Sequence, residues 1–230
     1  MGAPVCRACW ESLAPWTGPR CHRCGTPFAS VLAEDLADPT CGECKREAPP
    51  FDAARSFELY RGTLRKLILQ LKFQRRERLG KRLGALLKPL WDSLELQGSL
   101  LVPVPLHSSR QRERGFNQAE SLARGLARSL RQVGREPPVE THGLRRTRPT
   151  LPQTGLSLTA RRENVRGVFA VTHPERVRER SVALIDDVMT TGATLAACAE
   201  VLKKAGARRV CALTLARATP RFPDFEPPGP

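Results

Sequence analysis

Two adjacent carboxylates, Asp186 and Asp187, stand between a short apolar run and a loop rich in hydroxyl groups. Residues 182–185 are all apolar, which predicts a buried strand, and a helical pattern begins after the loop. The loop consists of Thr190, Thr191, Gly192, Ala193 and Thr194. Backbone N–H groups and the helix dipole favour an anion at such a helix N-terminus. Because carboxylates accept hydrogen bonds from sugar hydroxyls, the stretch predicts a site for a ribose that carries a 5′-phosphate.

Six of the eight cysteines lie within the first 44 residues as three Cys-x-x-Cys pairs. In a reducing compartment this spacing indicates metal binding rather than disulfides. The two pairs with a glycine at the turn are Cys21/Cys24 and Cys41/Cys44. Together they supply the four thiolates of a tetrahedral Zn²⁺ site. We expect this zinc to be structural, because residues 1–50 carry few large apolar side chains and need metal to fold. Cys6 and Cys9 have no assigned role.

Residues 51–219 alternate short apolar runs with amphipathic stretches, which predicts a mostly parallel sheet flanked by helices. The predicted strands are 56–60, 100–104, 168–171, 182–185 and 210–215, and the predicted helices include 64–71, 79–90 and 195–205. Cys198 and Cys211 fall in apolar surroundings and are expected in the core. Ligands bind at the carboxyl ends of the strands in such sheets, and Asp186 follows directly after one of these predicted ends.

A second anion-binding arrangement is predicted one unit earlier in the chain. A loop at residues 107–116 contains three arginines and ends in Gly115, and Asn117 with Glu120 has the spacing of a helix cap. The arginines are Arg110, Arg112 and Arg114. Residues 141–165 are polar and basic without a clear period, which is typical of a mobile active-site loop.

The formal net charge of +15 favours polyanionic partners, nucleic acid or phosphorylated metabolites, unless it reflects only an arginine-rich solvated surface. Cations crowd residues 65–82, where we expect single-stranded DNA to bind, although aromatic residues make up only 5% of the chain. No apolar run reaches transmembrane length and no signal peptide is recognisable, so we expect a cytoplasmic protein without membrane insertion. The proline-rich residues 220–230 are expected to be a disordered tail.

These motifs together resemble the ComF family of competence-associated, phosphoribosyltransferase-like proteins. The resembling stretches are residues 21–27, 41–44, 49–52, 69–73, 102–106 and 112–118, Thr150, Gln153, Arg161, Asn164, Gly167, and residues 182–194. The last of these resembles the phosphoribosyl-pyrophosphate (PRPP) motif of type I phosphoribosyltransferases. Many ComF relatives carry a double zinc ribbon with four Cys-x-x-Cys pairs, so the resemblance makes Cys6 and Cys9 the remnant of the first ribbon.

The resemblance implies an α/β fold with a type I phosphoribosyltransferase-like parallel sheet, spanning residues 51–219, and a small zinc ribbon at residues 1–50. It implies that Asp186 and Asp187 act on the ribose hydroxyls of Mg²⁺-bound PRPP and that residues 190–194 hold the 5′-phosphate. Arg114 and Gly115, or the basic residues 141–165, would face the pyrophosphate. It also implies a role with competence or DNA-uptake proteins in importing single-stranded DNA.

Two classes of function remain open at this point. One is a protein that binds PRPP without turnover and serves DNA uptake. The other is a catalytic phosphoribosyltransferase of nucleotide salvage or other metabolism unrelated to competence. The PRPP motif supports both, and no stretch identifies the acceptor of a transfer reaction.

Overall fold

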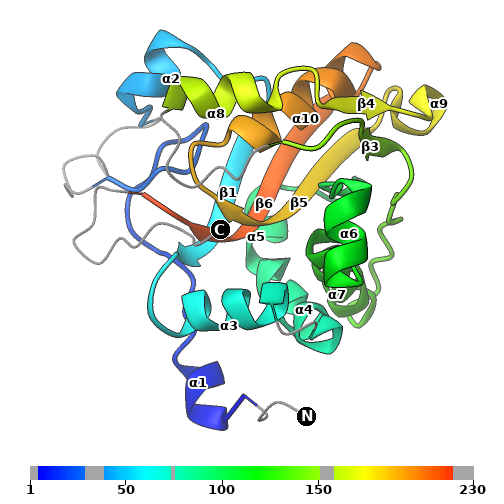
Figure 1. Cartoon of the computed structure of the whole chain (residues 1–230). Coiled ribbons are helices and arrows are strands. Elements are labelled where there is room, and N and C mark those ends of the chain that lie inside the picture. Colours follow the sequence, from blue (N-terminus) through cyan, green and yellow to red (C-terminus); the bar gives the residue numbers. More distant parts are fainter. Residues whose placement is uncertain (1–4, 29–38, 74–75, 151–157, 220–230) are drawn as a thin grey trace.

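The computed structural model describes residues 5–28, 39–73, 76–150 and 158–219 (Figure 1). A four-stranded parallel sheet in the order β1-β6-β5-β2 forms its centre. The strands are β1 (Ala53–Leu59), β2 (Leu100–Pro103), β5 (Ser181–Met189) and β6 (Arg209–Arg217). A separate antiparallel pair joins β3 (Leu144–Arg146) to β4 (Phe169–Val171). Parallel strands need crossover connections, which place helices on both faces of the sheet.

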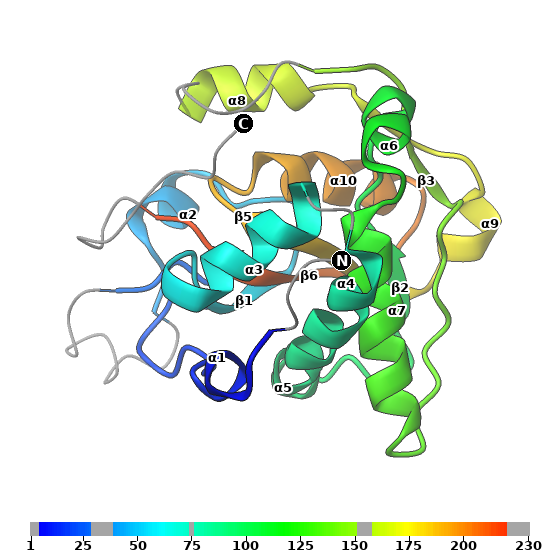
Figure 2. The same cartoon turned by 60° about the horizontal axis from the view of Figure 1, so that its bottom comes forward.

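The side chains of β5 alternate between two hydrophobic cores, one on each face of the sheet. Ala183 and Ile185 belong to the first core, and Val182 and Leu184 belong to the second. The first core is covered by α3 (Gly62–Phe73), α4 (Glu77–Gly84), the 3₁₀ helix η2 (Ala85–Leu87), α5 (Lys88–Ser93) and α7 (Gln118–Arg131). The second is covered by α8 (Leu158–Val165) and α10 (Ala193–Lys204), which lie on the other side of the sheet in both views (Figures 1 and 2).

The cysteine-rich N-terminal segment packs directly against the sheet. It contains α1 (Arg7–Glu11) and α2 (Gly42–Arg46). The Ala54 N–H donates to Arg23 O at 2.7 Å, so a cysteine knuckle lies along the edge strand β1. A Cβ on Gly25 would lie 2.5 Å from Ala54 O, so only glycine allows this approach. Three cysteines of this segment share the second core with Phe51.

The predicted fold class is confirmed in its α/β architecture, its parallel sheet and its flanking helices. The five predicted strands are present, and Cys198 and Cys211 are fully buried. Asn117 caps α7 by accepting a hydrogen bond from the Ala119 N–H at 3.0 Å. Gly206 follows α10 with a φ of +92°, the left-handed conformation in which a glycine commonly ends a helix.

Three local predictions are wrong. β5 does not end before the carboxylates but continues through them to Met189, because its second half pairs with β6 as far as Arg217. Most of the predicted loop at 107–116 is the helix α6 (Ser108–Arg114), which carries no buried residues and therefore no apolar period. Residues 141–165 contain β3 and α8, although residues 151–157 lie outside the described part. β3 is only three residues long and depends on distant β4, so its own sequence gives little signal.

The remaining described helix is α9 (Pro174–Val177). The predicted tail at residues 220–230 lies outside the described residues. Within the described ranges, none of the helices combines the length and the apolar character needed to cross a membrane.

Candidate functional site

The two predicted carboxylates occupy consecutive positions near the carboxyl end of β5. Asp186 Oδ1 accepts from the Asp187 N–H, and Asp187 Oδ1 accepts from the Val188 N–H, each at 2.9 Å. Asp187 is buried with 4% of its surface exposed, whereas Asp186 is half-buried. Because strand side chains alternate, the two carboxyl groups point to opposite sides of the sheet at this edge.

Lys72, at the C-terminal end of α3, pairs with the more buried carboxylate. Its Nζ lies 2.9 Å from Asp187 Oδ2, and the side chains are 16% and 5% exposed. Sequence reasoning grouped Lys72 with the DNA-binding cations of residues 65–82. The only signal that could have singled it out is its place in the ComF-like stretch at residues 69–73, because the ion pair joins distant parts of the chain.

Asp186 is held in an environment that disfavours its ionised form. Burial and, after it, the adjacent negative charge of Asp187 raise the pKa of Asp186 to about 8, although the positive charge of Lys72 opposes both effects. Hydrogen bonds donated by a ligand would stabilise the charged form of such a carboxyl group, so ligand binding and ionisation of Asp186 favour each other. Perturbed titratable groups of this kind are concentrated at functional sites.

The loop after β5 places backbone groups at the start of α10. Gly192 has a φ of +81° and is the N-cap of this helix, and a Cβ there would lie 2.7 Å from Met189 Cε. The Ala193 N–H donates to Thr191 Oγ1 at 3.3 Å. The first-turn N–H groups of a helix have no partner within the helix. The predicted loop residues 190–194 therefore surround a helix N-terminus that suits an anion.

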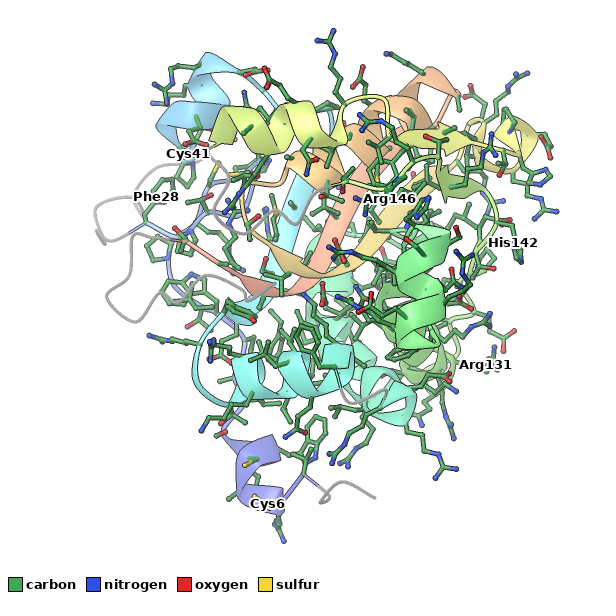
Figure 3. All side chains as sticks on the ribbon, in the orientation of Figure 1. Cys6, Phe28, Cys41, Arg131, His142 and Arg146 are labelled. Carbon is green, nitrogen blue, oxygen red and sulfur yellow. The ribbon has the colours of Figure 1, made fainter. Side chains whose placement is uncertain are left out.

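Arginines face the carboxylates from two other elements. Arg114 ends α6, and Gly115 follows it with a φ of +81°. Burial lowers the pKa of Arg114, and the charges of Asp187 and Asp186 partly offset that effect. Arg146 on β3 (labelled in Figure 3) has a pKa that burial and the charge of Arg110 lower and that the charge of Asp186 raises. Arg110 was predicted among the arginines of the loop at residues 107–116, whereas Arg146 was predicted only as part of the basic residues 141–165.

The four cysteines with the predicted zinc spacing lie together. The Sγ atoms of Cys21, Cys24, Cys41 and Cys44 are all within 4.8 Å of one another. The Cys24 and Cys41 Sγ atoms are 3.7 Å apart, and tetrahedral Zn–S bonds of about 2.3 Å place sulfurs about 3.8 Å apart. The N–H groups of Cys24 and Cys41 point to Cys21 Sγ at 3.5 and 3.4 Å, as they do toward thiolates. The donor set and spacing fit a structural zinc.

Cys6 and Cys9 do not join this cluster. Cys6 is exposed at the N-cap of α1, at the opposite end of the molecule from Cys41 (Figure 3). Within the described residues, the only group of cysteine, histidine and acidic side chains with metal-binding geometry is the four-cysteine cluster.

Several cations of residues 65–82 make contacts within the chain. Besides Lys72, Arg82 lies over the Trp10 ring with its Cζ 4.2 Å from the centroid, and Lys81 pairs with Glu77 at 3.0 Å. Lys66 and Arg78 are exposed. Arg75 lies outside the described residues.

Comparison with known proteins identifies the family. A family model described as a double zinc ribbon domain matches residues 1–52. Competence protein F of Haemophilus influenzae is 30% identical over 93% of this chain and 90% of its own length. The chain belongs to the ComF family. DNA utilization protein YhgH of Escherichia coli K12 is 32% identical over 86% of this chain and 83% of its own length. Competence protein ComFC of Bacillus subtilis is 28% identical over 93% of this chain and 84% of its own length.

Two solved structures are also similar to parts of this ComF protein. Glutamine PRPP amidotransferase from B. subtilis, complexed with ADP and GMP, matches 61% of this chain and 26% of its own with 23% identity and a TM-score of 0.36. A structure described as the allosteric regulatory enzyme of purine biosynthesis matches 59% of this chain and 26% of its own with 22% identity and a TM-score of 0.39.

Proposed function

We propose that this ComF family protein binds PRPP as its Mg²⁺ complex and acts in the uptake of DNA. The observation that carries the PRPP part is the arrangement of two carboxylates on β5, directly followed by a glycine-containing loop at the N-terminus of α10. The names of the relatives, competence protein and DNA utilization protein, support the part that concerns DNA. A cytoplasmic location agrees with reduced, zinc-binding cysteines.

In this proposal the carboxylates of Asp186 and Asp187 accept hydrogen bonds from the ribose hydroxyls. Thr190, Thr191, Gly192, Ala193 and Thr194 hold the 5′-phosphate through backbone N–H groups and hydroxyls. Arg114 and Gly115 face the pyrophosphate, and the charge interaction of Arg146 with Asp186 supports adding Arg146 to that side. Mg²⁺ arrives with the substrate, since it prefers phosphate oxygens with one or two carboxylates nearby. We further propose residues 1–50 as the zinc ribbon and residues 51–219 as the phosphoribosyltransferase-like domain.

The experiment for PRPP is calorimetric titration at fixed Mg²⁺. We expect the unmodified protein to bind PRPP and the Asp186→Asn/Asp187→Asn double variant, folded by circular dichroism, to lose at least a hundredfold in affinity. Undiminished affinity in the folded double variant would refute the site.

The catalytic alternative is tested separately by pyrophosphate release from PRPP across a panel of bases and amines. In transfer, the C1′–O bond to pyrophosphate breaks, a bond from C1′ to the acceptor nitrogen forms, and pyrophosphate leaves with Mg²⁺. The ribose carboxylates would orient the sugar and stabilise positive charge at C1′. Release that depends on one acceptor would favour the transferase over the binding protein.

For DNA we propose the exposed cations of α3 and α4 as contacts, because they neutralise phosphates and release counterions. A Lys66→Glu/Arg78→Glu variant should bind a single-stranded oligonucleotide several-fold more weakly, with an affinity that falls steeply with salt. Lys204→Glu, a change of an exposed lysine on α10, is the matched control. An unmodified protein that binds no DNA at about 50 mM salt would contradict the DNA part and leave the PRPP part standing.

A further inference from the structure

A cavity of about 360 Å³ lies where the zinc ribbon, α8 and α10 meet. The ribbon lines it with α2 and with the segment from Ala48 to Phe51, and the opposite walls are α8 and the N-terminal half of α10. Thr191, Gly192 and Ala193 line the same cavity. It therefore adjoins the loop that we propose for the 5′-phosphate, and its size is within the range of small-molecule sites.

The floor of the cavity is apolar. Phe51, Val165, Ala196 and Ala197 contribute to it from three separate parts of the chain. The alanines on α10 matter here, because larger side chains at these positions would fill the space between α10 and α8. Flat apolar walls of this kind suit the faces of a planar ring.

The polar groups around the cavity do not suit an anion. Arg162 is paired with Glu47 at 2.5 Å, which connects α8 to the C-cap of α2 across the cavity. Arg217 donates to Cys24 O at 3.2 Å and to Thr26 Oγ1 at 2.6 Å. Among the charged residues that line the cavity, Arg166 is then the one further cation, compared with three further acidic residues. These are Glu43, Glu163 and Glu200, of which Glu200 pairs with Lys204 on the surface.

Arg217 also offers a buried donor. The residue is 8% exposed, and its Nε has no hydrogen-bond partner within the described residues. A buried donor without a partner is unfavourable by about 1–3 kcal/mol unless a ligand or water satisfies it. The cavity thus combines apolar walls, carboxylate acceptors and guanidinium donors, with no excess of positive charge.

We propose that this cavity binds a free nucleobase beside the PRPP loop, with the zinc ribbon as one wall of the site. A nucleobase has flat apolar faces, ring or amino N–H groups for the glutamates and ring nitrogens or carbonyls for the arginines. Phosphorylated ligands are disfavoured by the acidic residues. The inference names the partner of the PRPP site and rests on the proposed function for that neighbouring loop.

The test uses the zinc-loaded full chain with Mg²⁺ and PRPP present, titrated with adenine, guanine, cytosine and uracil and followed by saturation-transfer NMR and calorimetry. We expect at least one base to bind. Ala197→Leu fills the cavity and should lower the affinity for that base at least tenfold, while the affinity for PRPP is unchanged. Ala85→Leu, the same change at a half-buried alanine of η2, is the matched control.

A second variant provides an independent test in case Ala197→Leu does not fold. Glu163→Gln removes a charged hydrogen-bond acceptor at an exposed position of α8. It should lower the affinity for the same base about threefold to tenfold and leave the zinc content unchanged. The inference is overturned if no base binds, or if a bound base is insensitive to both variants. Failure of the proposed function is distinguishable, because PRPP titration of the unmodified protein without base reports on it alone.

Discussion

At the scale of single residues, the fold places two carboxyl groups side by side although burial and mutual repulsion disfavour their ionisation. Asp186 has a pKa of about 8 in the folded protein, raised by burial and by Asp187, whereas an aspartate in an unfolded chain has a pKa of about 4. A group with a raised folded pKa stabilises the fold only below its unfolded pKa, and that contribution is lost as the pH rises toward 8. The two adjacent carboxyl groups are therefore present although ionisation of Asp186 lowers the stability of the fold, as is common at ligand sites.

Asp186→Asn should accordingly make the protein more stable at alkaline pH. We expect the free energy of unfolding in urea to rise by about 1–2 kcal/mol at pH 8, with a smaller gain at pH 5 and none at pH 4. Asp187→Asn is the informative counterpart, because it breaks the ion pair with Lys72 and should destabilise the protein at pH 8. A loss of stability in Asp186→Asn at pH 8 would contradict the electrostatic account.

Lys72→Met tests whether this lysine belongs to the PRPP site rather than to a DNA surface. Removing it leaves Asp187 buried without a counter-charge, which destabilises the fold by about 3 kcal/mol. It should also lower the affinity for Mg²⁺-PRPP about tenfold and make binding require more Mg²⁺, because the uncompensated carboxylates repel the anionic substrate. Lys66→Met, at an exposed position of the same helix, should change neither quantity. Equal PRPP affinities in both variants would exclude Lys72 from the site.

At the scale of elements, β5, the loop and α10 could be predicted because their signals are local. The apolar run, the acidic residues and the threonine-glycine loop are consecutive in the sequence. Helix ends also have local signals, because Asn117 caps a helix with its side chain and Gly206 ends one through its backbone freedom. The parts that sequence reasoning missed depend on distant partners. β3 exists only through β4, β5 extends past Asp187 only through β6, and Lys72 reaches Asp187 only after α3 packs on the sheet.

Gly192→Ala tests the conformation of the loop between β5 and α10. Alanine at a φ of +81° is disfavoured by about 1–2 kcal/mol, and its Cβ would press against Met189 Cε. We expect both lower thermal stability and an affinity for PRPP reduced at least tenfold. Gly98→Ala imposes the same strain at a φ of +77° with no atom within 4 Å, so it should lower stability alone. If the two variants bind PRPP equally, the loop does not hold the phosphate.

At the scale of the whole molecule, the zinc ribbon and the sheet are parts of one structure. Cys21, Cys24 and Cys41 pack in the same core as Phe51 and the strands β5 and β6. Arg217, at the end of β6, donates to the backbone of Cys24, and the following Ala218 N–H donates to Met189 O at 2.9 Å, beside the loop proposed to bind PRPP. The ribbon is thus connected to the candidate site through buried contacts.

Zinc removal should therefore destabilise the whole protein rather than only its N-terminal segment. Structural zinc contributes its binding free energy to folding, so Cys24→Ser should lower the melting temperature by roughly 10 °C or more in a single transition. The zinc content should fall from one ion per chain to none. Cys6→Ser, at an exposed thiol outside the cluster, should retain the zinc and the melting temperature. Loss of zinc in Cys6→Ser would mean that this pair contributes ligands, and an unchanged sheet transition in zinc-free Cys24→Ser would mean that ribbon and sheet fold independently.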